Sequence, residues 1–372
     1  MTDRENKEKT DRTEGENRTA HTMLADDIAQ IRPADEESRR LAGEHWMTVG
    51  KPLFSLGKLE KAVIDIAGIK GTPDYTLKKK GLLVLCADNG VVKEGVTQTG
   101  QDVTAIVAEN FTRRATSVCL MSEVAGVDVF PVDMGMIRDV PGVTRKEDKI
   151  AYGTKDFLEE PAMTRDQAER AILTGIRLVR EKQEAGYDIL ATGEMGIGNT
   201  TTSSAVVSVL LGEDPEKVTG KGAGLSDQGL SRKIAVIREA IAKWKPDAKD
   251  VPDVLSKVGG LDIAGLSGVF LGGALYHVPI VIDGFISAAA ALCAVRMCPY
   301  AADYILPSHL PKEAGGQKVL EALNLSPLLM CDMCLGEGSG AVAAMPLLDM
   351  GLSVYREMST FEEIQVEQYK VL

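Results

Sequence analysis

The sequence is poor in aromatic side chains and carries no excess of positive charge. Aromatic residues make up 5% of its 372 residues, and this scarcity disfavours a surface that stacks nucleic-acid bases. The formal net charge of −12 disfavours a polyanion as the main partner, although it leaves room for a local basic site that binds one phosphate. We therefore expect no nucleic-acid partner.

Membrane spans and paired cysteine motifs are also missing. One long apolar stretch, 259–286, is interrupted by Asp262 and Asp283, and no signal peptide is recognised, so we expect neither a membrane span nor export. Most of the six cysteines lie in apolar runs, which is typical of reduced, buried thiols in a cytoplasmic protein. Cys331 and Cys334 fit a redox motif or half of a metal site, but no second close Cys/His pair accompanies them. We therefore expect no metal.

What the sequence does contain is a strand, a glycine-rich turn and a helix within residues 187–211. The segment 187–192 is short, apolar and partly β-branched, and 203–211 is apolar enough to be a packed helix. Backbone N–H groups at such a helix start are unpaired, and the helix dipole favours an anion there. We therefore predict a phosphate site at the turn, formed by Gly196, Gly198, Asn199, Thr200 and Thr201.

The spacing of this turn excludes two common nucleotide sites. Gly193 and Gly198 are spaced as in a Walker A loop, but Asn199 follows where an NTPase needs lysine. The third glycine of a dinucleotide fingerprint is also missing. A turn without a ligand is the alternative, but Glu194 argues against it, because open α/β sheets bind ligands where strands end.

Strands alternate with helices along the chain, which predicts an α/β fold with a Rossmann-like parallel sheet flanked by helices. The predicted strands are 81–87, 127–132, 187–192, 278–282 and 303–306. The predicted helices are 25–49, 52–69, 102–111, a helix opened by the capping box Thr164–Gln167 and stopped at Gly186, 203–211, 226–242, 253–259, 262–274, 285–296, 316–323 and 341–350.

Acidic side chains end four of the predicted strands: Asp88, Asp133, Glu194 and Asp283. All four should lie at one edge of the sheet, beside a second glycine-rich turn, 220–225, that carries Lys221. Carboxylates bind hydroxyl groups, whereas the glycines and Lys221 can bind phosphate. The pattern predicts a sugar-phosphate site, with helix capping as the alternative explanation, for Asp283 in particular.

A further carboxylate, Glu337, lies between two glycines just before an apolar helix. Partial desolvation there would raise its pKa and make it a useful base near neutral pH. The alternative is an acidic residue favoured by the helix dipole. His309 is a second candidate for proton transfer.

Six blocks of sequence together resemble one known family. They are GEMGIGNTT (193–201), VTGKGAGLSDQGLSRK (218–233), DVLSKVGGLDIAGLSG (253–268), DGFISAAAAL (283–292), DYILPSHL (303–310) and LGEGSGAV (335–342). Their order and spacing resemble the nicotinate-nucleotide:dimethylbenzimidazole phosphoribosyltransferases over roughly residues 81 to 350. The resemblance implies transfer of ribose 5-phosphate from nicotinate mononucleotide to an aromatic base, with inversion at C1′. The products would be nicotinate and an α-ribazole phosphate for the lower nucleotide loop of cobalamin.

The resemblance also implies a domain organisation and the partners. It implies no metal or further cofactor, and a homodimer in which terminal helices form a smaller domain near the site. We accordingly expect a disordered tail at 1–24, a small helical domain from 25–70 and 341–372, and a large catalytic α/β domain at 71–340.

Residue roles follow from the matching blocks. Glu337 matches the general base that removes the azole N–H proton, and Glu194 matches a carboxylate that stabilises positive charge at the ribose. Lys221 and Ser308 lie in blocks that line the nucleotide site, together with the phosphate turn. The residues implied for the base pocket are Asp88, Asn89, Gln98, Gln101 and Leu335.

The loop 88–101 departs from the pattern of the family. Members that use dimethylbenzimidazole typically have a histidine after the aspartate and a Ser-x-Tyr-Pro-Gln segment, whereas this chain has Asn89 and then TQTGQ at 97–101. More polar walls leave the acceptor base open, with adenine or a substituted benzimidazole as alternatives. Two other functions also stay open at this point. They are a non-catalytic nucleotide-binding subunit and an unrelated phosphate-dependent hydrolase.

Overall fold

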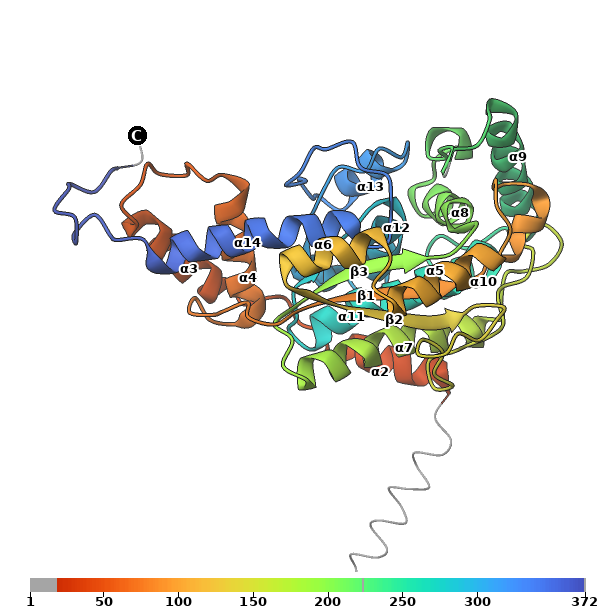
Figure 1. The fold of residues 1–372 in the computed structure, drawn as a ribbon, viewed down its shortest axis with the longest axis horizontal. Helices are drawn as coiled ribbons and strands as arrows, with labels where there is room; N and C mark the ends of the chain where they lie inside the picture. The colour runs from red at the N-terminus through yellow and green to blue at the C-terminus, as the bar shows by residue number, and fades with distance from the viewer. Residues whose placement is uncertain (1–18, 223, 371–372) are drawn as a thin grey trace, which may run out of the picture.

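The centre of the fold is a parallel sheet of five strands (Figure 1). The computed structural model describes residues 19–222 and 224–370. Its strands are β1 (Lys80–Ala87), β2 (Val127–Gly135), β3 (Ile189–Met195), β4 (Ile280–Val281) and β5 (Ile305–Leu306). They are ordered β2-β1-β3-β4-β5, and every neighbouring pair is parallel, which confirms the predicted α/β class. The chain leaves β1 toward β2 on one side and returns to β3 on the other. The switch point, where open sheets bind ligands, therefore lies between β1 and β3.

Helices cover both faces of this sheet and extend beyond its ends (Figure 1). They are α2 (Ala20–Gln30), α3 (Glu36–Thr48), α4 (Lys58–Lys70), α5 (Asp102–Thr112), α6 (Ser117–Ala125), α7 (Arg165–Glu184), α8 (Asn199–Leu211), α9 (Asp227–Trp244), α10 (Val251–Val258), α11 (Leu261–Leu275), α12 (Phe285–Met297), α13 (Gly316–Ala322) and α14 (Ser339–Glu357), with the 3-10 turns η1 (Gly90–Glu94), η2 (Pro215–Lys217) and η3 (Pro299–Tyr304). Helix α11 lies against one face with α7 and α2 outside it, and α5, α6 and α14 cover the other (Figure 1).

Two predictions at the N-terminal side need correction. A helix begins at Ala20, so the predicted disordered tail 1–24 extends too far, and its residues 1–18 lie outside the described part of the chain. The predicted helix 25–49 is two helices, α2 and α3. The chain is extended at Ile31, and Pro33 follows, whose ring fixes φ and lacks the N–H that a continuous helix would need.

Alternate residues of β1 belong to two separate cores. Leu83 and Leu85 are completely buried in the core on the α11 side, whereas Leu82 and Val84 are completely buried in the core that includes α14. A strand whose side chains are buried on both faces is expected in a parallel sheet covered by helices on both sides.

Glycines allow α7 and α11 to pack with their backbones almost in contact. A Cβ added at Gly268 would overlap the carbonyl oxygen of Ile172, and one added at Gly175 would overlap the carbonyl oxygen of Gly265. We expect Gly268→Ala to lower the free energy of unfolding by about 3 kcal/mol or more, because backbone atoms of two helices must separate. Urea unfolding measures this loss.

Gly43→Ala, in α3, is the matched control for that substitution. Its added Cβ would meet only Ile64 Cδ1, at 3.9 Å. Since alanine is a better helix former than glycine, this variant should be as stable as the parent or more stable by up to about 1 kcal/mol. Equal stability of the two alanine variants would contradict the close packing.

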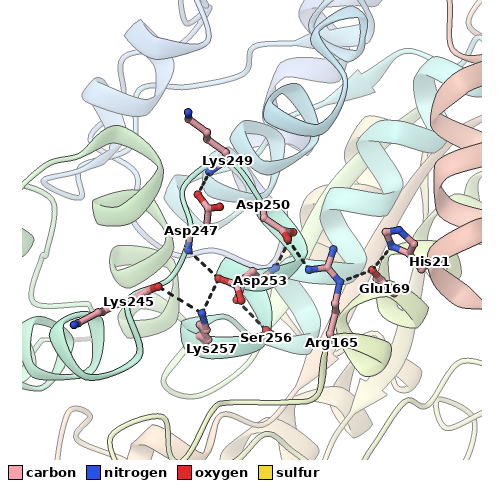
Figure 2. A network of polar contacts seen from close by, with 10 residues as sticks. All are labelled: His21, Arg165, Glu169, Lys245, Asp247, Lys249, Asp250, Asp253, Ser256 and Lys257. Atoms are coloured by element: carbon pink, nitrogen blue, oxygen red, sulfur yellow. Dashed lines mark hydrogen bonds and ion pairs between the residues drawn. The ribbon is translucent and has the colours of Figure 1, made fainter.

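A polar network joins α2, α7 and the start of α10 (Figure 2). Glu169 Oε1 lies 2.9 Å from His21 Nδ1 and 2.9 Å from Arg165 Nε, and Arg165 Nη1 lies 2.6 Å from Asp250 Oδ2. Asp250 in turn accepts from Asp253 N and so caps α10. The network fixes the helix that leads directly into the buried start of α11.

Helices α3 and α4 pack with the far end of α14 at one end of the molecule, whereas α2 lies against α7 (Figure 1). The rings of Trp46 and Tyr355 meet edge to face at 5.2 Å, and Val49 forms an antiparallel bridge with Thr360. The beginning of α14, including Val342, belongs to the same core as β1. The division of the chain at residue 341 stays a prediction, because α14 is shared between the sheet and the terminal helices.

Cysteine exposure divides the six thiols into two groups. Cys86, Cys119, Cys293 and Cys298 are buried, whereas Cys331 and Cys334 are exposed, and all six are free thiols. Burial raises the pKa of Cys293 to about 12, which makes this thiol unreactive at neutral pH. In the part of the chain that the structure describes, no helix is long and apolar enough to cross a membrane.

Candidate active site at the carboxyl edge of the sheet

Two carboxylates, Glu194 and Glu337, meet beside the switch point. Glu194 lies within β3 and not in the turn after it. A Cβ at Gly193 would lie 2.5 Å from the carbonyl oxygen of Glu337, and one at Gly336 would lie 2.6 Å from Glu194 Oε1. These two glycines therefore let the segment before α14 lie directly on β3. They bring together two acidic residues that are far apart in the sequence.

Glu194 is buried, with 7% of its surface exposed. Its Oε2 accepts a hydrogen bond from Asn199 Nδ2, at the first residue of α8. Burial raises the pKa of Glu194 to about 8, with a further rise from the nearby charge of Asp262 and an opposing effect from Asn199. A carboxylate in this setting gains its negative charge only in mildly alkaline solution unless a cation binds beside it.

Glu337 occupies a strained backbone position with φ of 61°, between Gly336 and Gly338, which also have positive φ. Strain of this kind in a non-glycine residue is typical of functional sites. Its Oε2 accepts from the backbone N–H of Val118 at 3.3 Å, in the first turn of α6. Burial raises the pKa of Glu337 against the lowering effect of this hydrogen bond. The predicted rise in the pKa of Glu337 is thus confirmed in direction.

Asp283 fixes the segment that carries Glu337. Its Oδ1 accepts from Gly340 N at 2.7 Å and from Ala341 N at 3.2 Å, and its Oδ2 accepts from Gly338 N at 3.2 Å. The capping interpretation is therefore confirmed for Asp283. The helix that it caps is α14, however, and not α12, which follows it in the sequence.

The other two acidic strand ends support the fold. Asp133 is fully buried, 3.0 Å from Lys149 Nζ, and accepts from Thr144, so the prediction that it belongs to the site is wrong. Asp88 is also fully buried, and its Oδ2 accepts from Ile137 N at 2.8 Å. It begins the loop that was expected to bind the acceptor base, but its side chain has no exposed surface there.

A lysine that was not predicted as a site residue contacts the predicted phosphate turn. Lys233 of α9 is fully buried, and its Nζ lies 2.7 Å from Thr200 Oγ1 and 3.2 Å from the carbonyl oxygen of Gly220. Burial lowers the pKa of Lys233 to about 8. Lys221, by contrast, is half-exposed and forms an ion pair with Asp227 at 2.7 Å. The missed signal was a lysine on the apolar face of a helix, one turn from Ile237.

Close packing accounts for two of the glycines in this turn. A Cβ at Gly196 would lie 2.5 Å from the carbonyl oxygen of Ala87, and one at Gly198 would lie 2.9 Å from Val92 Cγ2. Gly198 also has φ of 92° and precedes α8. The buried Thr201 Oγ1 has no hydrogen-bond partner among the described residues. The turn is thus held tightly between β1 and η1.

The loop expected to hold the acceptor base contacts the second glycine-rich turn. Gln98 Nε2 donates to the carbonyl oxygen of Gly224, and Gln101 Nε2 donates to that of Asn89 at 3.0 Å. The Asn89 side chain itself is fully buried. Leu335, on the opposite segment, is 53% exposed, so an apolar surface is available beside Glu337.

Ser308 and His309 follow β5, at the same edge of the sheet as Glu194. Both are buried, with Ser308 Oγ 3.2 Å from His309 Nδ1. Burial lowers the pKa of His309, which keeps its imidazole neutral at pH 7. The imidazole lines a small pocket together with Glu194, Asp283 and Glu313. Across residues 19–222 and 224–370, no group of three or more His, Cys, Asp or Glu side chains is arranged to hold a metal ion.

Comparison with known proteins assigns the chain to a family. A family described as Phosphoribosyltransferase matches residues 31–366. The chain belongs to this phosphoribosyltransferase family. A relative from Ruminiclostridium cellulolyticum, named nicotinate-nucleotide–dimethylbenzimidazole phosphoribosyltransferase, is 47% identical over 347 residues, which are 93% of this chain and 98% of that protein. A relative of the same name from Acetivibrio thermocellus is 47% identical over 340 residues, 91% of this chain and 95% of its own length.

A solved structure supports the same assignment for the phosphoribosyltransferase. It is the crystal structure of CobT from Thermus thermophilus, which superposes with a TM-score of 0.85 at 37% sequence identity and covers 90% of this chain and 100% of its own. The protein is therefore an enzyme of the pentosyltransferase class. The predicted family and fold are both confirmed.

Proposed function

We propose that this phosphoribosyltransferase moves ribose 5-phosphate from nicotinate mononucleotide to an aromatic base of the benzimidazole type. The products are nicotinate and an α-ribazole 5′-phosphate, used in assembling the lower nucleotide loop of a cobamide. The observation that carries the proposal is the approach of Glu194 and Glu337 beside the switch point, which the glycine contacts permit. The names of the close relatives supply the two substrates.

Two carboxylates assist the bond changes in this mechanism. The Glu337 carboxylate takes the N–H proton of the azole while the other ring nitrogen attacks C1′ of the ribose. The bond from C1′ to the pyridinium nitrogen breaks, and its electron pair returns to the ring to give nicotinate. The Glu194 carboxylate stabilises the positive charge that develops at C1′. Attack from the side opposite the leaving group accounts for inversion.

The phosphate is held at the start of α8 by Thr200, Thr201 and Lys233, where the helix dipole and the buried ammonium both favour an anion. The exposed Lys221 and the buried Ser308 keep a secondary, nucleotide-lining role. The base rests against Leu335 and the loop with Gln98 and Gln101. Asp88 and Asn89 support that loop at its start, and no metal or further cofactor takes part. We also propose a cytoplasmic homodimer, for which exposed apolar side chains on α5 and α6 give support.

A competition among acceptor bases tests the proposal. Nicotinate mononucleotide is supplied with dimethylbenzimidazole, a substituted benzimidazole and adenine at equal concentrations, and the ribotides are identified by mass spectrometry. We expect nicotinate release only when a base is present. We also expect a base other than dimethylbenzimidazole to be used at least as well, because the loop 97–101 offers amides and hydroxyls in place of an aromatic wall.

Three outcomes would contradict these statements separately. Nicotinate release without any base would indicate a hydrolase, and exclusive use of dimethylbenzimidazole would remove the inference about the loop. The absence of any turnover with all bases would favour a nucleotide-binding protein without activity.

A further inference from the structure

A buried amide connects Glu194 to an acidic residue of α11. Asn199 Nδ2 donates to Glu194 Oε2 on one side. On the other side it faces Asp262, since a Cβ added at Gly196 would lie 3.3 Å from that same nitrogen and 2.8 Å from Asp262 Oδ2. Asp262 is fully buried. One side-chain amide thus stands between two buried carboxylates.

Asp262 has an incomplete set of hydrogen bonds. Its Oδ1 accepts from Ile263 N at 3.0 Å, but its Oδ2 has no hydrogen-bond partner among the described residues. A buried carboxylate oxygen without a donor is costly and calls for an explanation. The position in the first turn of α11 favours negative charge through the helix dipole. The amide of Asn199 also lowers the pKa of Asp262, although burial raises it overall to about 6.

The charged side chains that act most strongly on Glu194 are acids. Among the described residues these are Asp262, Asp283 and Glu337, and all three raise its pKa. The titratable groups that face it from the packed elements are Asp262 of α11, Asp283 after β4, Glu337 before α14, Cys86 of β1, and His309, Glu313 and Cys334, which line the same pocket. Of these charges, Asp262 raises the pKa of Glu194 most, and among the described residues it alone shares the Asn199 amide with Glu194.

We propose that Asp262 is a positioning residue for the transfer reaction, which fixes the orientation and the charge of Glu194 through the Asn199 amide. This inference rests on the proposed role of Glu194 at the ribose. In the free enzyme, the negative charge of Asp262 holds a proton on Glu194. Nicotinate mononucleotide brings a pyridinium cation beside Glu194, and the proton is released on binding. At neutral pH, the Glu194 carboxylate is then charged only when the nucleotide is in place.

The pH dependence of kcat/KM for the nucleotide tests this role. Because the pKa of Glu194 is raised to about 8, its charged form is lost as pH falls, and kcat/KM should fall with it. Asp262→Asn removes a neighbouring negative charge and should move this acidic limb to lower pH by on the order of one unit. Asn199→Ala removes a hydrogen bond to the charged form and should move the limb to higher pH. A limb that stays in place in both variants would overturn the proposal.

Ser267→Ala is the matched control on the same helix. Ser267 is buried and donates to the carbonyl oxygen of Ile263 at 2.8 Å, and its hydroxyl also contacts the uncharged Cys293 of α12. This substitution disturbs the packing of α11 without a change of charge, so the acidic limb should not move. A loss of rate at every pH in Asp262→Asn, with the limb unmoved as in the control, would mean that Asp262 is only structural.

Infrared titration measures the protonation of Glu194 without any turnover. The carbonyl band of its protonated carboxyl group is identified as the one that Glu194→Gln removes. In Asp262→Asn this band should disappear at lower pH than in the parent protein. If the parent fails to transfer ribose phosphate, the proposed function fails but this titration still tests the link. If transfer occurs and the band is unaffected by Asp262→Asn, only the present inference is lost.

Discussion

Glu337→Gln is expected to lower kcat by roughly two to four orders of magnitude, because a glutamine cannot accept the azole proton in the transition state. The substitution preserves the shape of the side chain, and its amide oxygen can still accept from Val118 N. Binding of nicotinate mononucleotide should therefore stay within a few-fold of the parent in calorimetry. Initial rates of nicotinate release at saturating nucleotide and base measure kcat.

Asp332→Asn provides the control for this experiment. Asp332 is exposed on the same segment and, like Glu337, has positive φ, which asparagine tolerates. We expect this variant to turn over at the parental rate. If Glu337→Gln retained a kcat similar to that of Asp332→Asn, Glu337 would not be the base, and the neutral His309 would become the next group to substitute.

Lys233→Met is expected to raise KM for nicotinate mononucleotide by about 10- to 100-fold, the range for a lost hydrogen bond to a charged group. The methionine fills a similar volume in a site where the lysine has no exposed surface. The thermal midpoint should therefore be unchanged or raised, since the cost of burying an ammonium is removed. KM for the acceptor base should change little. Initial rates over a range of both substrates separate the two effects.

Lys221→Met decides between the two lysines near the turn. Lys221 is half-exposed and already paired with Asp227, so its removal should change KM for the nucleotide by less than about threefold. If Lys221→Met had the larger effect on KM, the phosphate would be bound by the exposed turn 220–225. The buried Lys233 would then be a structural residue.

The sequence predicts the larger elements of this fold because their patterns are strong. The apolar run of β1 and the Thr164 capping box of α7 appear where they were expected. The nine-residue α6 was missed, because its apolar residues define no single stripe: Val118 and Cys119 are buried, whereas Leu120 and Val124 are exposed. The predicted strands 278–282 and 303–306 are too long, because β4 and β5 pair over only two residues each. The length over which a strand pairs depends on its neighbours and not on its own composition.

The sequence singled out candidate site residues where local signals exist, and their roles stay predictions. Glu194 and Glu337 stand out because glycines flank them and strands or helices adjoin them. Lys233 and Asp262 have no such signal: one lies within an amphipathic helix, and the other looked like an interruption of an apolar run. Their importance arises from burial and from partners more than 30 positions distant, such as Thr200 for Lys233. Only the folded chain reveals these partners.

Helix α14 gives the distant C-terminal segment a direct mechanical connection to Glu337, the proposed base. Its 19 residues span about 28 Å as one continuous helix with Pro346 in its interior, which begins two residues after Glu337 and ends against α3. A small tilt at its far end displaces its near end, where Asp283 holds the backbone. Purification tags and truncations at the C-terminus therefore act on the active site, although they are remote from it. A tag at the opposite terminus is the better choice for kinetic work.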